Sequence, residues 1–231
     1  MNLTPKLLLF ATFVLVMLLM SYNYRKRKKR IVCFGDSITE QGNRGSGYIK
    51  KLFGFLQMEG LSEKYEIIGS GIGGNKVTDL YERLAEDILS KGAEIVIIYI
   101  GINDVWHKLQ NKGTDVASFT STYEALIEKI TTAGIKMLLC TPSLIGELNN
   151  HENLQDEDVE RYAEIVRTIA DQYNLPLIDL RKSFLEYNLI NNTTNVADGI
   201  LTTDGVHLNE TGNNLVAKEI WNVLAPEIAK V

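Results

Sequence analysis

The tripeptide GDS, which ends at Ser37, places a serine directly after a short apolar run, IVCF, at residues 31–34. A serine hydroxyl is a weak nucleophile near neutral pH and needs a general base within hydrogen-bond reach. On its own, a serine at the end of such a run is more often a polar turn residue. A nucleophilic Ser37 therefore requires the rest of the chain to supply a base, an acid that orients the base, and donors for a developing oxyanion.

Among the three histidines, His207 has an acidic neighbour at a useful spacing. Asp204 precedes it by three residues in the motif DGVHLN. In a tight turn or a first helical turn, this spacing brings the carboxylate to one imidazole nitrogen and leaves the other free to accept a proton. His107 and His151 lie in polar segments that suit surface or structural roles. His207 is therefore the predicted base, and Asp204 its orienting acid.

Acyl transfer also needs hydrogen-bond donors aimed at the oxygen on which negative charge develops. The glycine-rich motif GSGIGGN allows close backbone approach, and the amide of Gly74 is its candidate donor. The motif GIND supplies the side-chain amide of Asn103, and the backbone amide of Ser37 completes a set of three. Gly71 and Gly73 are near enough to Gly74 to be alternatives.

The elements that must position these residues alternate along the chain. Short apolar runs rich in β-branched residues predict strands covered on both faces, at residues 31–34, 65–70, 94–100, 135–140 and 175–180. Amphipathic stretches predict helices near residues 48–58, 77–90, 118–132, 156–173 and 210–229. This alternation predicts an α/β fold, a three-layer α/β/α sandwich around a five-stranded parallel sheet. Ligands bind such sheets beyond the carboxyl ends of the strands, where these motifs fall.

Taken together, the motifs resemble the blocks of the SGNH (GDSL-type) esterases and lipases. The segment FGDSITEQG resembles the first block, the glycine-rich segment the second, GIND the third and DGVHLN the last, in the family's order. The resemblance covers essentially all of residues 31–229 and implies a flavodoxin-like sandwich. The G-x-S-x-G elbow of the common α/β-hydrolases is not matched, because position 39 is threonine.

The resemblance also implies a role for each site residue. Ser37 would be the nucleophile, with Asp204 and His207 completing a triad. The amides of Ser37 and Gly74, together with the Asn103 side chain, would form the oxyanion hole. The expected reaction is hydrolysis of a carboxylic ester through an acyl-serine intermediate, with no metal and no organic cofactor.

The expected substrate is a short acyl ester, such as an acetyl ester, of an alcohol or a sugar, because the chain has no separate lid domain. Trp106, directly after GIND, is a candidate for lining the substrate pocket, and a buried core tryptophan is an equal alternative. An acyltransferase with the same triad, a lysophospholipase and a thioesterase remain open. A non-catalytic ester- or glycan-binding module is disfavoured by the intact triad.

The charge distribution bears on the partners of the chain. Of its 24 basic residues, seven lie in residues 1–30, which hold no acidic residue. The rest of the chain holds the other 17 basic residues and all 29 acidic residues, which gives it a net charge of −12. So acidic a domain is a poor ligand for nucleic acid. The two cysteines, Cys33 and Cys140, each lie in an apolar run and suit buried hydrophobic positions. The composition leaves the oligomeric state open.

Residues 1–30 and 31–231 form two parts, a hydrophobic leader with a basic cluster and the hydrolase domain. The leader has an apolar core of about 14 residues, followed by the six basic residues RKRKKR and no A-x-A-like cleavage site. This pattern favours a single membrane anchor over a cleaved signal peptide. The positive-inside rule then places the domain in the cytoplasm, with a secreted or extracytoplasmic enzyme as the alternative. Because the basic cluster meets the amino end of the first strand, the site should face away from the bilayer.

Overall fold

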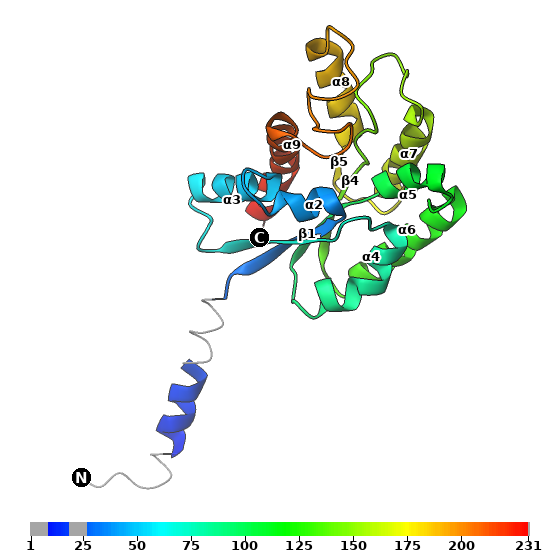
Figure 1. Ribbon diagram of the computed structural model, residues 1–231. Coiled ribbons are helices and arrows are strands. Elements are labelled where there is room, and N and C mark those ends of the chain that lie inside the picture. The colour runs from blue at the N-terminus through cyan, green and yellow to red at the C-terminus, as the bar shows by residue number, and fades with distance from the viewer. Residues whose placement is uncertain (1–8, 19–26, 231) are drawn as a thin grey trace, which may run out of the picture.

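The computed structural model describes residues 9–18 and 27–230 of the chain. Its centre is a sheet in which neighbouring strands are all parallel, in the order β2-β1-β3-β4-β5 (Figure 1). The strands are β1 (Lys29–Gly35), β2 (Tyr65–Gly71), β3 (Ile95–Tyr99), β4 (Lys136–Cys140) and β5 (Leu177–Ile178). The predicted five-stranded parallel sheet is therefore confirmed.

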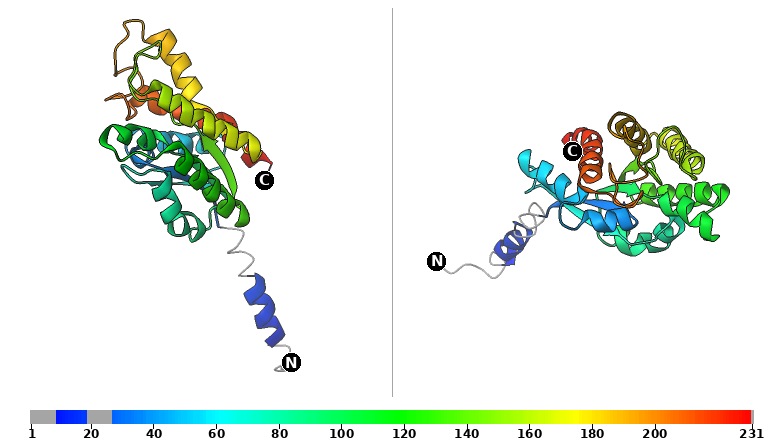
Figure 2. Two further views of the ribbon diagram at one scale, coloured as in Figure 1. Left: turned by 90° about the vertical axis from the view of Figure 1, so that its right-hand side faces the viewer. Right: turned by 45° about the horizontal axis from the view of Figure 1, so that its top comes forward.

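Helices cover both faces of the sheet. They are α2 (Ser37–Gly42), α3 (Tyr48–Met58), α4 (Val77–Leu84), α5 (Ile102–Trp106), α6 (Val116–Thr132), α7 (Asp156–Gln172), α8 (Leu180–Asn191) and α9 (Glu210–Ala229). The core on one face is built with α3, α8 and α9, and the core on the other face with α4, α6 and α7 (Figures 1 and 2). The three predicted layers are thus present.

The strands read as continuous apolar runs because both of their faces are buried. In β1, Ile31 and Cys33 pack in the core that contains α3 and α9, whereas Val32 and Phe34 pack in the core that contains α4 and α6. Side chains alternate between the two faces of a strand, so each face needs its own apolar set. Cys33 and Cys140 are both free and buried.

Several elements differ from the sequence prediction, and the short helices α2 and α5 were not among the predicted helices. Helix α8 was not predicted, and β5 is shorter than residues 175–180, because Asp179 caps α8 by accepting a hydrogen bond from the Lys182 amide at 3.1 Å. The helix predicted over residues 77–90 is regular only to Leu84. It continues as a π-helical turn, Ala85–Leu89, in which the Ser90 amide donates to the Ala85 carbonyl at 2.9 Å.

The N-terminal part is described as a helix over residues 9–18, whose large apolar side chains are exposed. The other residues of the predicted anchor, and residues 25 and 26 of the basic cluster, lie outside the described residues. Within residues 9–18 and 27–230, no helix combines the length and apolar character needed to cross a bilayer. The membrane anchor therefore stays a prediction.

The strand order sets the position of the candidate site. The chain moves outward from β1 to β2 on one side, then returns to place β3 on the other side of β1. Such a reversal opens a crevice beyond the carboxyl ends of the two central strands, where ligands bind in sheets of this kind. Ser37 follows β1, Gly74 follows β2 and Asn103 follows β3. The topology thus gathers at one edge three residues from distant parts of the sequence.

Candidate active site

Ser37 occupies the first position of α2, immediately beyond the tip of β1. Asp36 caps this short helix, and its carboxylate accepts a hydrogen bond from the Ile38 amide at 2.9 Å. Gly35 allows the end of β1 to lie close to β3, because a Cβ there would lie 2.3 Å from the Tyr99 carbonyl oxygen. Cap and glycine together fix the serine at the end of a buried strand.

His207 lies within hydrogen-bond distance of both Ser37 and Asp204. Its Nε2 is 3.0 Å from the Ser37 Oγ, and its Nδ1 is 2.7 Å from the Asp204 Oδ2. The other carboxylate oxygen, Oδ1, accepts from the amides of Val206 at 3.0 Å and His207 at 2.7 Å. Asp204 is therefore held by its own turn while it orients the imidazole. The structure brings together the three residues that the sequence assigned to the triad.

The carboxylates at this site differ in their electrostatics. Burial raises the pKa of Asp204, but hydrogen bonds from the His207 side chain and from two amides outweigh it and bring that pKa below its usual value. Burial raises the pKa of Asp36 to about 7, and that of Asp104 to about 6. Asp204 therefore stays ionised beside the imidazole, whereas Asp36 retains its proton over much of the acidic range.

Gly74 is the best placed of the three candidate glycines to act as an oxyanion donor. The Gly73 amide is already used, because it donates to the Glu40 Oε2 at 2.9 Å. Gly71 belongs to β2 and packs against α2, where a Cβ would lie 2.1 Å from the Glu40 amide nitrogen. Gly74 has φ of +79°, which favours glycine, and its amide donates to no other described residue.

Asn103 lies in α5, just after β3, and the residue is 3% exposed. One of its two amide N–H groups has a partner, since Nδ2 donates to the Asn75 carbonyl at 3.0 Å. This bond joins the loop after β3 to the loop after β2. An amide nitrogen carries two hydrogens, so the second is available for a ligand. The Ser37 amide, first in its helix, has no acceptor within that helix.

A buried carboxylate that the sequence analysis did not single out holds the segment before Asp204. Glu147 is fully buried, and it accepts from the amides of Ile200 at 2.7 Å, Leu201 at 2.8 Å and Thr202 at 2.6 Å. The Thr202 hydroxyl adds a fourth bond at 2.6 Å. No periodicity or motif marks Glu147, because its partners are backbone groups about 54 residues away.

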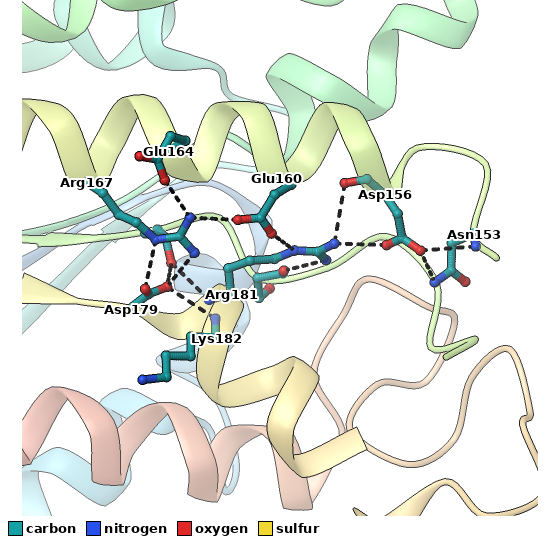
Figure 3. A network of polar contacts seen from close by, with 10 residues as sticks. Asn153, Asp156, Glu160, Glu164, Arg167, Asp179, Arg181 and Lys182 are labelled. Carbon is teal, nitrogen blue, oxygen red and sulfur yellow. Dashed lines mark hydrogen bonds and ion pairs between the residues drawn. The ribbon is translucent and has the colours of Figure 1, made fainter. Parts of the chain in front are cut away.

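A partly buried ion-pair network joins α7, the start of α8 and the loop that precedes α7 (Figure 3). Arg181, fully buried at the start of α8, pairs with Asp156 at 3.0 Å and with Glu160 at 3.1 Å. Asp156 in turn accepts from the Asn153 side chain at 2.8 Å. The Asn153 side chain also bonds both the amide and the carbonyl of Leu148, at 3.0 and 2.8 Å. Breaking such a pair would leave a buried charge without a partner, which is strongly destabilising.

Trp106 lies against the candidate triad and is half-buried. Its ring meets that of His207 edge to face, with centroids 6.2 Å apart and an interplanar angle of 68°. The same tryptophan lines a groove of about 340 Å³ that also contacts Leu109, Leu154, Asp198 and Asp204. The groove combines an indole, aliphatic side chains and carboxylates.

His107 also lies closer to the site than its polar sequence context indicated. Its Cε1 is 4.0 Å from the point that a Gly74 Cβ would occupy. Burial lowers the pKa of His107, and Lys76 and Lys112 lower it further. The side chain is therefore a neutral neighbour of the Gly74 loop at pH 7.

The chain is similar to known lipases, acylhydrolases and esterases. The family model of the GDSL-like lipases/acylhydrolases matches residues 31–220. The crystal structure of an acetyl xylan esterase, AlAXEase, superposes with a TM-score of 0.82 at 49% sequence identity, covering 84% of this chain and 98% of that one. An acetylxylan esterase of Geobacillus stearothermophilus is 26% identical over 206 residues, which are 82% of this chain and 91% of that protein.

Solved structures of Axe2, an acetylxylan esterase from Geobacillus stearothermophilus, include catalytic mutants in which a serine, an aspartate or a histidine is replaced by alanine. The serine mutant superposes with a TM-score of 0.74 at 25% identity and covers 86% of this chain and 96% of that one. Those three residue types are the ones that converge at Ser37.

Proposed function

We propose that this chain, which belongs to the GDSL-like lipase/acylhydrolase family, removes acetyl groups from the hydroxyls of sugars such as those of xylan. The chain is a serine carboxylic ester hydrolase. The observation that carries the proposal is the line of contacts from Ser37 through His207 to Asp204, which supplies a nucleophile, a base and an orienting acid. The acetyl xylan esterases among its relatives support the acetyl sugar as substrate.

In the first half of the proposed reaction, His207 Nε2 takes the proton of the Ser37 hydroxyl as the oxygen attacks the acetyl carbonyl carbon. The carbonyl oxygen becomes an oxyanion, stabilised by the amides of Ser37 and Gly74 and by the Asn103 side chain. Asp204 fixes the Nδ1–H tautomer and stabilises the imidazolium that forms. When the intermediate collapses, His207 gives its proton to the sugar oxygen, and the sugar alcohol leaves.

In the second half, a water molecule takes the place of the sugar. His207 removes a proton from that water, which attacks the acetyl carbonyl of the acyl-serine. The same three donors stabilise the second oxyanion. Collapse returns the proton to the Ser37 oxygen and releases acetic acid, which ionises at neutral pH. The acyl group thus passes to water and no cofactor is consumed.

The groove beside Trp106 is where we place the sugar. An indole offers an apolar face to the C–H groups of a pyranose ring, and carboxylates such as Asp198 accept hydrogen bonds from its hydroxyls. Because Asp204 forms part of the groove wall, a sugar bound there would lie next to the triad. This position gives Trp106 a role in substrate binding.

A panel of esters tests the proposal. Hydrolysis of 4-nitrophenyl acetate, butyrate and octanoate is compared with release of acetate from acetylated xylo-oligosaccharides, with Ser37→Ala as the control. We expect kcat/KM to be highest for acetyl esters, and acetate to be the product even with excess alcohol present. Preference for octanoate, or transfer of the acetyl group to the alcohol, would contradict the proposed substrate and reaction.

We also propose that the N-terminal segment tethers the domain to a membrane, with the domain in the cytoplasm. The exposed apolar helix over residues 9–18 and the basic residues beside it support this proposal. The full chain should sediment with membranes and a chain beginning at residue 27 should not. Equal recovery of both chains in the soluble fraction would rule out the tether without bearing on catalysis.

A further inference from the structure

The side chain of Arg83, in α4, lies between the carboxyl ends of β1 and β2 and is 13% exposed. Its Nη2 donates to the Gly35 carbonyl at 2.7 Å and to the Ser70 carbonyl at 3.2 Å. Its Nε donates to the Asn75 Oδ1 at 2.7 Å. Its Nη1 donates to the Ser70 hydroxyl at 3.3 Å and to the Asp87 carboxylate. One cation therefore ties together two strand ends and a loop.

These contacts use the full donor capacity of the side chain. A guanidinium carries five N–H groups in a fixed planar fork, and Arg83 makes five contacts. Its plane also lies over the Phe34 ring, with 4.5 Å from the guanidinium carbon to the ring centroid. Bonds in several directions and the ring contact leave the guanidinium little freedom to move. The groups that it binds are correspondingly fixed relative to one another.

The groups bound by Arg83 adjoin the candidate oxyanion donors. Gly35 lies two residues before Ser37, and Asn75 follows Gly74 directly. The Asn75 carbonyl accepts the bond from the Asn103 side chain at 3.0 Å. Arg83 thus bonds the residue two positions before Ser37 and the residue directly after Gly74. The Asn103 side chain is linked to Arg83 through Asn75, which both of them bond. None of these three donors is itself touched by Arg83.

From this arrangement we propose that Arg83 is the positioning residue of the oxyanion hole, holding the Ser37 amide, the Gly74 amide and the Asn103 side chain in register. The inference rests on the proposed function and adds a residue that neither motifs nor spacing indicated. Arg83 does not contact the substrate. It acts on catalysis through the placement of donors, which must lie about 3 Å from the developing oxyanion and be held there to within a fraction of an ångström.

The π-helical turn after α4 supplies the counter-charge that holds Arg83. Asp87, in that turn, pairs with Arg83 and with Lys91, the latter at 2.8 Å. Burial raises the pKa of Asp87, but the hydrogen bonds from Lys91 and Arg83 outweigh it, so the carboxylate remains ionised. Single π-helical turns inside helices often occur at functional sites.

Lysine cannot reproduce this role, which gives the first variant for the test. Arg83→Lys keeps the positive charge but offers a point-like ammonium in place of the planar fork, so several of the five contacts are lost. We expect kcat for acetyl ester hydrolysis to fall about 10- to 100-fold, with KM changed less than threefold. Affinity for a short-chain trifluoromethyl ketone, which forms a tetrahedral adduct on serine, should fall by the same factor as kcat.

Two further variants separate positioning from general stability. Arg167→Lys is the matched control, because Arg167 also makes several ion pairs, with Asp179, Glu160 and Glu164, in a network outside the oxyanion loops (Figure 3). It should lower the melting temperature but leave kcat per folded molecule unchanged. Asn75→Ala removes only the acceptor of the Arg83 Nε and serves if Arg83→Lys does not fold. Like Arg83→Lys, Asn75→Ala should lower kcat.

A double-variant cycle tests the mechanism directly. If Arg83 acts through the oxyanion hole, Arg83→Lys should cost at least fivefold less in kcat when Asn103 is already alanine. The inference is overturned if Arg83→Lys retains wild-type kcat and ketone affinity. It is overturned too if Arg83→Lys lowers kcat by the same factor with and without Asn103→Ala. It is also overturned if Arg167→Lys lowers kcat as much. A wild-type protein inactive on every acetyl ester would instead refute the proposed function, so the two failures are distinguishable.

Discussion

The Oγ of Ser37 lies 3.0 Å from the Nε2 of His207, although 170 residues separate them in the sequence. Ser37 is held at the tip of β1, and His207 lies in the loop that precedes α9. Packing of α9 on the same side of the sheet as α3 brings the end of the chain back to its first strand. The candidate active site is therefore a product of the whole fold, and contacts distant from it should affect it.

Asp204→Asn should lower kcat by about 10³- to 10⁴-fold. The asparagine can still accept the amides of Val206 and His207, but its NH₂ group cannot accept the Nδ1–H of the imidazole, so the wrong tautomer is favoured. Steady-state hydrolysis of 4-nitrophenyl acetate measures the effect. Asp115→Asn, which keeps the cap of α6 and changes no residue assigned to catalysis, is the control and should be fully active. Activity of Asp204→Asn within tenfold of wild type would exclude the proposed orienting role.

Asn103→Ala should lower kcat about 10²- to 10³-fold and leave KM nearly unchanged, because the lost donor acts on the oxyanion and not on the bound ester. The exposed Asn191, whose side chain bonds only the Tyr187 carbonyl among the described residues, gives the control Asn191→Ala. A rise in KM without a fall in kcat would show that Asn103 binds the ground state instead.

Glu147→Gln should lower the free energy of unfolding by about 2 kcal/mol. Both carboxylate oxygens of Glu147 accept backbone N–H groups, so either orientation of the amide sets an NH₂ group against a donor. Urea unfolding measures the change. Glu152→Gln, a surface carboxylate with one bond to Asn195, should change stability by less than about 0.5 kcal/mol. Equal stability of the two variants would refute the stabilising role of the hydrogen bonds that Glu147 accepts.

Asp36→Asn should change how stability depends on pH between about 4 and 7. Burial raises the folded-state pKa of Asp36 to about 7, whereas the unfolded value is near 3.8, so the folded chain holds a proton that the unfolded chain has lost. In wild type this carboxyl makes stability fall as pH rises through that window. The asparagine keeps the cap on Ile38 and has no proton to lose. The fall in the free energy of unfolding with pH should therefore be less steep, by the slope that corresponds to about one bound proton.

Urea unfolding at several pH values between 4 and 7.5 measures this difference. Asp104 is present in both proteins, and its charge raises the pKa of Asp36, so the comparison measures Asp36 together with that coupling. Parallel curves for wild type and Asp36→Asn would show that Asp36 is ionised in the folded protein across the window.

The sequence was most informative about regular apolar patterns and about the polar motifs that follow them. The continuous, β-branched apolar run at β3 predicted a strand covered on both faces, which the structure confirms, and the predicted last helix matches α9 at Glu210–Ala229. Polar motifs at the ends of β1 and β3 must meet at one edge of a parallel sheet, which is why Ser37 and Asn103 could be assigned to one site, whereas His207 was assigned from its spacing to Asp204 and from the resemblance. Their roles in catalysis stay predictions until they are measured.

The parts that could not be predicted depend on contacts between distant residues. Helix α8 is held by Arg181, whose ion-pair partners lie on α7. Glu147 binds mostly backbone amides, which any sequence can provide, and Arg83 binds two backbone carbonyls and three side chains that no local spacing brings together. The preference for Gly74 over Gly73 follows from the Gly73 amide being taken by Glu40, a contact that spacing does not indicate.

Labelling with a fluorophosphonate probe tests the central claim most directly. Intact mass and peptide mapping of the full chain should show one probe adduct, on Ser37, with the loss of acetyl esterase activity in proportion to labelling. Ser37→Ala, which should fold normally, should show no adduct and at least a 10³-fold loss of kcat. A well-folded wild-type protein that takes no label, or an adduct on another residue with activity intact in Ser37→Ala, would contradict the assignment of Ser37 as the nucleophile.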